Sequence, residues 1–362
     1  MIPRWVRLAY WFSQLGPKAG PAVRREEIEW EGRRSLFYLP RSGRPVGAWL
    51  ISPGAHPQGP DDPRLDRLAR ILADAGFAVL SPAVPDLMDL RLTRRAIEEV
   101  EAAFHQLCRR KELPPGCRPA VLGPCVGSLA ALYLAASDRC SRSISAVVTM
   151  GAYADPGVLL DALVPPDGVP SRADPLNRPV LFVTLLDHLP GVSHCDRAPL
   201  TEAWRDYVRL TWPHAHLKTP GSVAHHPIAR AVAARHGLPS EAERVFLMGC
   251  GVLPGGHDLC RAALFAPGAP YAYLDPRPIL ASVAAPVYAV HGRGDVVIPF
   301  EQLRVLADGL PEGVRRATYV TGFLRHSDLV GARTLLGMLP ALLSEIRTGR
   351  SVLRTLAQVG NA

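Results

Sequence analysis

The sequence predicts an α/β fold with a mainly parallel, doubly wound sheet and an inserted segment. Short apolar runs bounded by proline and glycine alternate with longer stretches that carry apolar residues at helical spacing. One of these runs leads directly into a cysteine that stands between two glycines. About 130 residues then separate two parts with the same alternation, several times the roughly 30 residues of a whole β-α-β unit.

The first half of the chain contains most of this alternation. Asp62–Ala75 is predicted to be a helix because its leucines recur at helical spacing and Gly76 follows as a stop signal. Met1–Gly16 mixes apolar and basic residues without a long apolar core, which predicts a short helix and not a signal peptide. The other expected elements are strands at Ser35–Leu39, Val46–Ser52, Phe77–Leu80, Ala120–Leu122 and Ile144–Met150, and helices at Arg91–Arg110 and Ser128–Ala136.

The same pattern returns near the end of the sequence. Strands are expected at Pro286–Val290 and Ala317–Val320, and helices at Phe300–Ala307 and Ser327–Ile346. Residues 1–154 and 286–362 are therefore predicted to form the α/β core. Residues 155–285, rich in proline, glycine and histidine, are predicted to be an inserted cap. Part of the insertion, the strand-like Val180–Leu186, is also compatible with the main sheet.

Cys125 lies in the segment Val121-Leu122-Gly123-Pro124-Cys125-Val126-Gly127-Ser128. A strand, then G-x-C-x-G, then a helix of small residues is the nucleophile-elbow pattern with cysteine in place of serine. A thiol at a helix N-terminus is favoured as thiolate by the helix dipole. The backbone N–H of Val126 would face an oxyanion formed beside the sulfur. The alternative is a buried cysteine packed beside two structural glycines.

Asp295 and His326 are the predicted partners of Cys125. Asp295 follows the strand Pro286–Val290 in a glycine-rich turn, and His326 follows the next strand. Both positions lie at the carboxyl edge of a parallel sheet, where ligands bind. The order nucleophile, acid, histidine is also the order of this kind of triad. An Asx turn or helix cap is the alternative role for Asp295, and a solvated loop position is the alternative for His326.

On these residues the chain resembles the α/β-hydrolase superfamily, most closely bacterial members with a cap inserted before the acid-bearing strand. The resemblance covers about Pro45–Ala152 and Pro286–Leu342. It rests on the turn around Cys125, on the stretch His291–Pro299 and on His326. The nucleophile is similar to that of dienelactone hydrolase and of polyhydroxyalkanoate synthases. The resemblance implies an α/β-hydrolase fold and a Cys-Asp-His triad.

Two segments depart from the pattern of those families. Ser128 stands where dienelactone hydrolase and the synthases have a third glycine. The expected oxyanion segment reads Ser52-Pro53-Gly54-Ala55-His56, with Pro53 where His-Gly is usual. We expect the backbone N–H of Ala55 to be the second oxyanion donor, with that of Gly54 as the alternative.

These groups suffice for acyl transfer, which needs a nucleophile, a proton shuttle and oxyanion donors. The sequence predicts an acyl-group hydrolase, an esterase, thioesterase or lactone hydrolase, that acts through a cysteine acyl-enzyme. An acyltransferase or cyclase with the same triad is the first alternative. A non-catalytic relative is the second, and intact Asp295 and His326 argue against it. The expected partner is a small-molecule or carrier-bound acyl substrate, and the natural substrate and oligomeric state stay open.

Composition bears on nucleic-acid binding, location, membrane spans and metal binding. The net charge is +8, but the arginines are scattered, so we expect no nucleic-acid partner. The seven cysteines contain no C-x-x-C pair, which favours a reducing, cytoplasmic location. No run of about 18 apolar residues occurs, so no membrane span is expected. His214 and His216 form the best candidate metal pair, but no further ligand completes it, and we expect neither metal nor cofactor.

Overall fold

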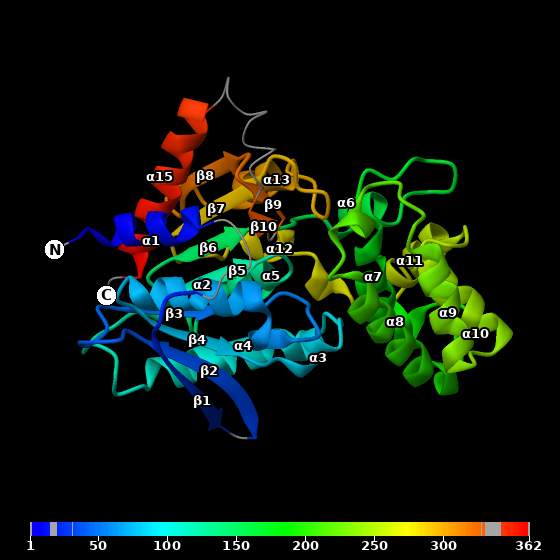
Figure 1. Ribbon diagram of the computed structural model, residues 1–362, viewed down its shortest axis with the longest axis horizontal. Coiled ribbons are helices and arrows are strands. Elements are labelled where there is room, and N and C mark those ends of the chain that lie inside the picture. The colour runs from blue at the N-terminus through cyan, green and yellow to red at the C-terminus, as the bar shows by residue number, and fades with distance from the viewer. Residues whose placement is uncertain (1, 15–19, 31, 327, 330–341, 361–362) are drawn as a thin grey trace.

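An eight-stranded sheet forms the centre of the molecule (Figure 1). It is seen in a computed structural model that describes residues 2–14, 20–30, 32–326, 328–329 and 342–360. The strands are β1 (Arg24–Trp30), β2 (Arg33–Leu39), β3 (Ala48–Ile51), β4 (Ala78–Pro82), β5 (Ala120–Pro124), β6 (Val147–Met150), β7 (Val287–Gly292) and β8 (Arg315–Thr321). Their order in the sheet is β1-β2-β4-β3-β5-β6-β7-β8.

The six strands from β4 to β8 in that order are parallel, and β1 and β2 extend the sheet as an antiparallel hairpin. This arrangement confirms the predicted fold class. The sequence analysis did not predict β1, since its residues alternate charged and apolar around an exposed edge without a buried run. Of the predicted strands, β5 and β6 matter most for function because they pair at Gly123 and Thr149, beside the turn at Cys125.

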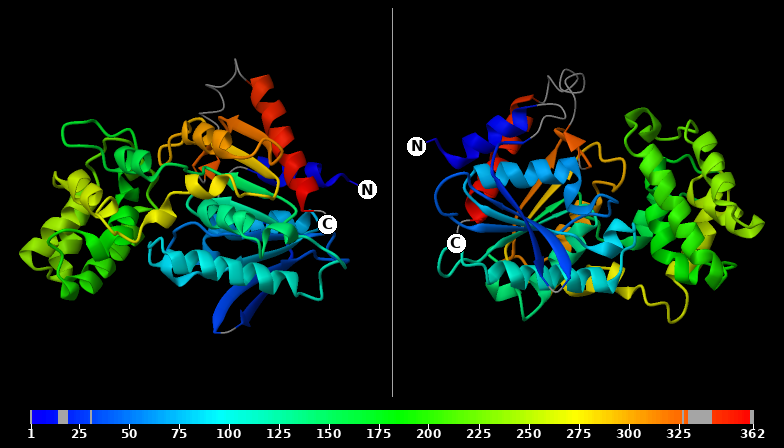
Figure 2. Two further views of the ribbon diagram at one scale, coloured as in Figure 1. Left: turned by 180° about the vertical axis from the view of Figure 1, so that it is seen from behind. Right: turned by 60° about the horizontal axis from the view of Figure 1, so that its bottom comes forward.

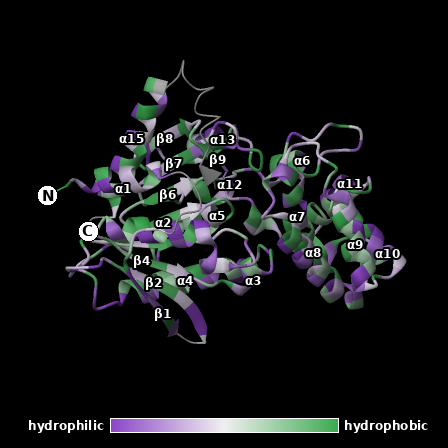
Figure 3. Ribbon diagram, in the orientation of Figure 1, coloured by the Kyte–Doolittle hydropathy of each residue, from purple (hydrophilic) through white to green (hydrophobic). Residues whose placement is uncertain are grey.

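Helices cover both faces of the sheet, as the right-hand view of Figure 2 shows. One face is packed by α1 (Arg4–Ser13), α2 (Pro63–Asp74) and α15 (Leu342–Val359), the other by α3 (Pro85–Met88), α4 (Arg94–Cys108), α5 (Gly127–Ala136), α12 (Arg277–Leu280) and α13 (Gln302–Gly309). Neighbouring strand residues serve opposite faces. Trp49 belongs to the same apolar cluster as Leu72 and Leu356, whereas Leu50 belongs to the cluster of Phe104 and Leu129. Figure 3 shows green and purple residues alternating along covering helices such as α2 and α4, as amphipathic packing requires.

A helical lobe lies beside the sheet, on the right in Figure 1. We define this lobe as α6 (Pro156–Leu163), α7 (Arg178–Leu185), α8 (Arg197–Thr211), α9 (His226–His236), α10 (Ser240–Gly249) and α11 (Gly256–Leu264). Its buried side chains, such as Phe182, Trp204 and Phe246, belong to the same apolar cluster as those of α4 and α5. The lobe and the sheet are therefore packed together through a continuous core.

The strand-like interpretation of Val180–Leu186 is wrong, because α7 runs through these residues. Helix α7 contacts α8, α10 and α11, and Phe182, Val183 and Leu185 are buried. A helix enclosed in this way is apolar on several sides, and periodicity cannot distinguish it from a buried strand. Pro179, in the first turn of α7, is the local signal for a helix start.

The predicted final helix, Ser327–Ile346, is wrong at Asp328–Leu329 and confirmed at 342–346. Asp328–Leu329 is a short strand, β10, that pairs with β9 (Leu324–Arg325). Residues 327 and 330–341 lie outside the described residues, and helix α15 runs from Leu342 to Val359. Its apolar residues Val352, Leu353 and Leu356 pack in the cluster with α1 and the sheet, which explains why the helix continues beyond the predicted range. Among the described helices, none combines the length and apolar character needed to cross a bilayer.

Candidate active site

Cys125 occupies the sharp turn between β5 and α5. Its backbone is left-handed, with φ of 51°, which is uncommon for a residue other than glycine. The turn is fixed on both sides: the Cys125 N–H donates to the Met150 carbonyl at 2.8 Å, and the Cys125 carbonyl accepts the Ser128 hydroxyl at 2.6 Å. Such strain persists only where the surroundings enforce it, and it directs the thiol into the cavity.

The two glycines of the turn have a steric cause. A Cβ on Gly123 would lie 2.7 Å from the Cα of Ser128, and a Cβ on Gly127 would lie 2.3 Å from the carbonyl oxygen of Ser52. The Ser52 hydroxyl donates to the Gly127 carbonyl at 2.8 Å. Helix α5 therefore approaches both its own strand and the loop after β3 too closely for any side chain at these positions.

The side chain of Asp295 is fully buried in the turn after β7. Its Oδ1 accepts the backbone N–H groups of Val297 and Ile298 at 2.8 and 2.9 Å. Its Oδ2 lies 3.4 Å from Nε2 of His291 and 3.1 Å from Nδ1 of His326. Burial alone would raise the pKa of Asp295, but the charge of His326 and the hydrogen bonds hold it well below its usual range.

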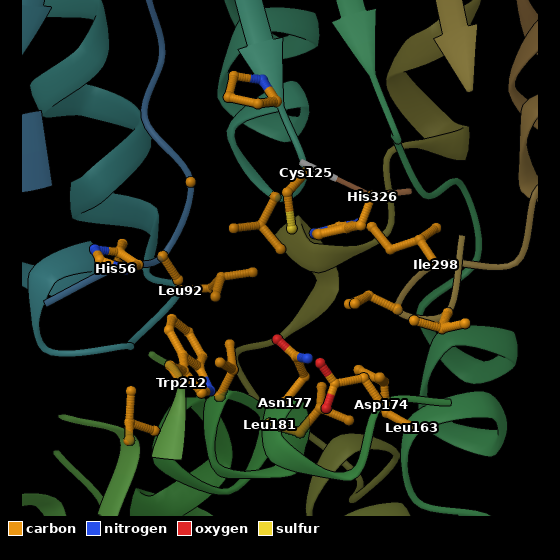
Figure 4. A pocket seen from close by; sticks show the side chains of 18 of the residues that line it. His56, Leu92, Cys125, Leu163, Asp174, Asn177, Leu181, Trp212, Ile298 and His326 are labelled. Atoms are coloured by element: carbon orange, nitrogen blue, oxygen red, sulfur yellow. The ribbon is translucent and has the colours of Figure 1, made fainter. Parts of the chain in front are cut away.

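His326 follows β9 and also has a left-handed backbone, with φ of 48°. Its Nδ1–H donates to the Asp295 carboxylate, and Figure 4 shows its ring beside the sulfur of Cys125. Burial alone would lower the pKa of His326, but interaction with Cys125 and with Asp295 raises it well above that of free histidine. The surroundings therefore favour an imidazolium next to the sulfur.

The predicted oxyanion donors lie in the same place. Ala55, Cys125 and Val126 line one cavity, and a Cβ built on Gly54 would lie 3.7 Å from the Cβ of Cys125. Within the described parts of the chain, the backbone N–H groups of Gly54, Ala55 and Val126 donate no hydrogen bond to another residue. Unpaired donors beside the sulfur are suited to a developing oxyanion.

The cavity that these residues share has a volume of about 1460 Å³ and lies between the sheet edge and the helical lobe. Leu159, Leu160 and Leu163 of α6 form an apolar wall, and Lys218 and Arg64 lie among the polar residues that line the cavity. The lobe is held to the sheet side by the Leu92 N–H, which donates to Thr184 at 3.1 Å, and by an ion pair of 3.0 Å between Arg205 and Asp89.

The structure brings together all five site residues expected from the sequence: Cys125, Asp295, His326, Val126 and Ala55. Other residues around them were missed. Gly151 comes after β6 with φ of 63°, and a Cβ there would lie 3.2 Å from Oδ2 of Asp295. Asp174 and Asn177 line the cavity from the lobe side (Figure 4). A glycine directly after a predicted strand is a signal for Gly151, whereas no local pattern marks the other two.

One group of side chains away from this cavity has metal-ligand chemistry. Glu101 and His105 on α4 lie near Cys140, with all three ligand atoms within 4.8 Å of one another. The Cys140 sulfur is 3.6 Å from Nε2 of His105, a separation that a thiol hydrogen bond also produces. The rings of His214 and His216 are 5.7 Å apart and belong to no three-ligand group among the described residues.

Comparisons with known proteins bear on the fold of the chain. No family model and no curated sequence matches the chain. Among solved structures, 2,6-dihydroxy-pseudo-oxynicotine hydrolase is 16% identical to this chain, with a TM-score of 0.51. The match covers 94% of this chain and 70% of the hydrolase. An α/β hydrolase, GrgF, from a Penicillium species is 15% identical with coverages of 92% and 99% and a TM-score of 0.47. Dienelactone hydrolase from Anabaena variabilis is 12% identical with coverages of 90% and 97% and a TM-score of 0.42.

At identities this low, structural similarity shows the fold alone, and the chemistry has to be argued from the residues of the site. The TM-score of 0.51 to 2,6-dihydroxy-pseudo-oxynicotine hydrolase shows that the two chains share an overall architecture. The chain has the α/β-hydrolase fold.

Proposed function

We propose that the protein is an acyl-group hydrolase that acts through a cysteine acyl-enzyme. The observation that carries this proposal is the position of the Cys125 sulfur, on a strained turn beside the His326 ring, whose other nitrogen is bonded to buried Asp295. Nucleophile, base and orienting acid in hydrogen-bonded sequence are the signature of covalent acyl transfer. The structural neighbour with the TM-score of 0.51 is itself a hydrolase by name, which is in keeping with this class.

In the first half-reaction the Cys125 sulfur attacks the carbonyl carbon of an ester or thioester. A carbon–sulfur bond forms, and the carbonyl oxygen takes the negative charge beside the N–H groups of Val126 and Ala55. The tetrahedral intermediate then collapses, the bond to the leaving group breaks, and the His326 imidazolium gives its proton to the departing alcohol or thiol. Asp295 compensates the imidazolium charge before this transfer and orients the ring throughout.

In the second half-reaction His326 takes a proton from water, and the resulting hydroxide attacks the thioester carbon. Collapse breaks the carbon–sulfur bond and releases the carboxylic acid, while the thiolate–imidazolium pair is restored. A thioester also passes its acyl group to amines and alcohols. Acyl transfer to such an acceptor is therefore the alternative that shares every step up to this point.

We further propose that the helical lobe is a cap over the site, within an insertion at residues 155–285. The contacts that support this role reach from the lobe to the loops around Cys125: the Trp212 ring packs 5.4 Å from that of His56, next to Ala55. Helix α12, although inside the inserted range, packs on α5 and α13. The hydrolase core would then comprise residues 1–154 and 286–362 together with α12.

We also propose a reducing, cytoplasmic location. All seven cysteines are free in the structure, and burial raises the pKa of the Cys250 thiol well above its usual value, so that cysteine is suited to packing and not to disulfide exchange.

The test of the catalytic proposal is a screen with p-nitrophenyl esters and acyl thioesters of varied chain length, run on the wild type, Cys125→Ala, Cys125→Ser and His326→Ala. We expect either alanine variant to lose nearly all turnover and the double alanine variant to be little worse, because the two groups act as a unit. Cys125→Ser preserves the shape of the site and controls for folding. Full activity in Cys125→Ala on the best substrate would refute the proposal.

Labelling provides a measurement that does not depend on knowing the substrate. Cys125 should react with iodoacetamide faster than the six other cysteines, as peptide mapping after brief exposure would reveal, and His326→Ala should abolish this preference. Turnover that requires an added amine or alcohol would favour acyl transfer over hydrolysis.

A further inference from the structure

Two polar side chains interrupt the apolar wall opposite the catalytic sulfur. Asp174 and Asn177 lie on the segment that leads into α7, and Figure 4 shows both pointing from the lobe into the cavity, toward the side occupied by Cys125 and His326. Around them the cavity is lined by leucine and isoleucine side chains, including Leu163, Leu181 and Ile298. Polar groups in such a wall have a desolvation cost unless they bind something.

Asp174 is held rigidly. It is 4% exposed, its N–H donates to the Val296 carbonyl at 2.7 Å, and its Oδ1 accepts the Leu176 N–H at 3.0 Å. Val296 is the residue after Asp295, so Asp174 is anchored to the same turn that carries the catalytic acid. This anchoring fixes the distance between the carboxyl group and the reacting atoms.

The side chain of Asp174 caps the short helical turn that follows it, but this role does not require a carboxylate. Serine or asparagine would satisfy the Leu176 N–H as well, and at this position burial raises the pKa of Asp174 to about 6, with Lys218 and His326 acting in the opposite direction. The cap uses one oxygen, while a carboxylate offers about four acceptor positions. The acceptor positions that the cap does not use face Asn177 and the cavity.

We propose that Asp174 and Asn177 form a polar subsite for a hydroxyl group on the substrate, so that the preferred substrates are hydroxylated esters or thioesters. This inference rests on the proposed hydrolase function. A hydroxyl group donates one hydrogen bond and accepts others, and the pair offers a carboxylate acceptor together with an amide donor. An ammonium group cannot accept from Asn177, and it would meet the positive charges of Lys218 and the His326 imidazolium in the same cavity.

Matched substrate pairs test the subsite. In the acyl arm, p-nitrophenyl hexanoate is compared with its derivatives hydroxylated at each position from C3 to C6. In the alcohol arm, propyl butyrate is compared with glyceryl monobutyrate. We expect the wild type to prefer the hydroxylated member of at least one pair by about tenfold or more in kcat/KM, as a hydrogen bond to a charged partner allows. The arm that shows the preference identifies which part of the substrate carries the hydroxyl group.

The variants separate recognition from folding. Asp174→Ser keeps a capping oxygen but removes the carboxylate, and Asn177→Leu removes the amide donor. Either change should reduce the preference to less than about threefold, mainly by lowering kcat/KM for the hydroxylated member of the pair. Leu181→Ala, on the same wall, is the matched control and should leave the preference unchanged. A purely structural role would lower kcat/KM for both members of a pair alike.

Protection of Cys125 provides a readout without turnover. Hexanamide and its hydroxylated derivatives are unreactive analogues whose protection against iodoacetamide reports binding in the cavity. Hydroxylated amides should protect at concentrations about tenfold lower in the wild type but not in Asp174→Ser. Ester hydrolysis without any preference in turnover or protection would overturn this inference and leave the proposed function intact. Selective protection without hydrolysis of any ester would retain the subsite and overturn the function.

Discussion

The substitution Gly127→Ala tests the contact between helix α5 and the loop that follows β3. The added Cβ would lie 2.3 Å from the Ser52 carbonyl oxygen and 2.6 Å from that of Pro53. Tight contacts begin below 3.4 Å, so the loop or the helix has to retreat by about 1 Å, and overpacking of this kind costs about 1–3 kcal/mol.

The expected loss of stability is smaller than the upper value of about 3 kcal/mol for overpacking. Alanine is favoured over glycine in a helix by about 1 kcal/mol, which offsets part of the strain. We therefore expect the free energy of unfolding to fall by up to about 2 kcal/mol, or Tm by up to about 3 °C for a chain of this length. Activity should fall further, because Ser52 and Pro53 carry the loop that presents the Ala55 N–H, which we propose as an oxyanion donor. Losing one such donor lowers kcat on the order of a hundredfold.

Thermal unfolding and kcat/KM on the best p-nitrophenyl ester, measured on the same preparations, separate these two effects. Gly313→Ala is the matched control, since a Cβ at Gly313 has no neighbour within 4 Å among the described residues, and it should leave both quantities within error. If Gly127→Ala were as stable and as active as the wild type, the close approach of α5 to this loop would be refuted.

Three further predictions concern buried polar groups. Asp295→Asn should lower kcat/KM by on the order of a thousandfold or more and slow the alkylation of Cys125, because a neutral amide cannot balance the imidazolium. It should also flatten the acid dependence of stability: the pKa of Asp295 is lowered on folding, so its contribution is present above about pH 4 and lost as the pH falls below that value. Gln302→Ala removes the acceptor of the Ala154 and Asp155 N–H groups, which bond to Gln302 at 2.9 and 2.8 Å. Urea unfolding should show a free energy of unfolding lower by about 2–3 kcal/mol. Gln302→Glu is the control, because it keeps an acceptor for both groups. Burial lowers the pKa of His225 to about 4, so the wild type should lose stability as the pH falls from about 6.5 toward 4, and His225→Gln should lose less.

Each of these predictions has a contrary result. An Asp295→Asn variant with the activity and the acid profile of the wild type would remove Asp295 from the proposed mechanism. Urea midpoints equal in Gln302→Ala and the wild type would show that the two N–H groups find other partners. An unchanged acid profile in His225→Gln would mean that His225 is accessible to protons in the folded protein.

The sequence was sufficient for the parallel part of the sheet and for the turn at Cys125 because local patterns determine both. Parallel strands buried on two faces are continuous apolar runs, and the glycines around Cys125 are required by contacts within a few residues and one neighbouring loop. The order of Asp295 and His326 along the chain then followed from the topology. These features depend on short stretches of sequence that have few structural alternatives.

The lobe could not be predicted in the same way. Helix α7 is enclosed by α8, α10 and α11, so its sequence lacks the polar face that would have identified it as a helix. Asp174 is far from Cys125 in sequence, and only the packing of the lobe brings it to the cavity. The short pairing of Leu324–Arg325 with Asp328–Leu329 around His326 is likewise too brief to produce a periodic signal.

The continuous apolar cluster that joins α4 and α5 to the lobe has a consequence for protein engineering. A module that can be exchanged between enzymes usually ends at a polar boundary, where few contacts cross. Here Phe182 of the lobe and Leu129 of the sheet-covering layer belong to one cluster of fully or almost fully buried side chains. Deleting the lobe would leave an aggregation-prone apolar surface on the remainder, so altered substrate range is better sought by changing side chains along the cavity wall than by grafting a different insertion.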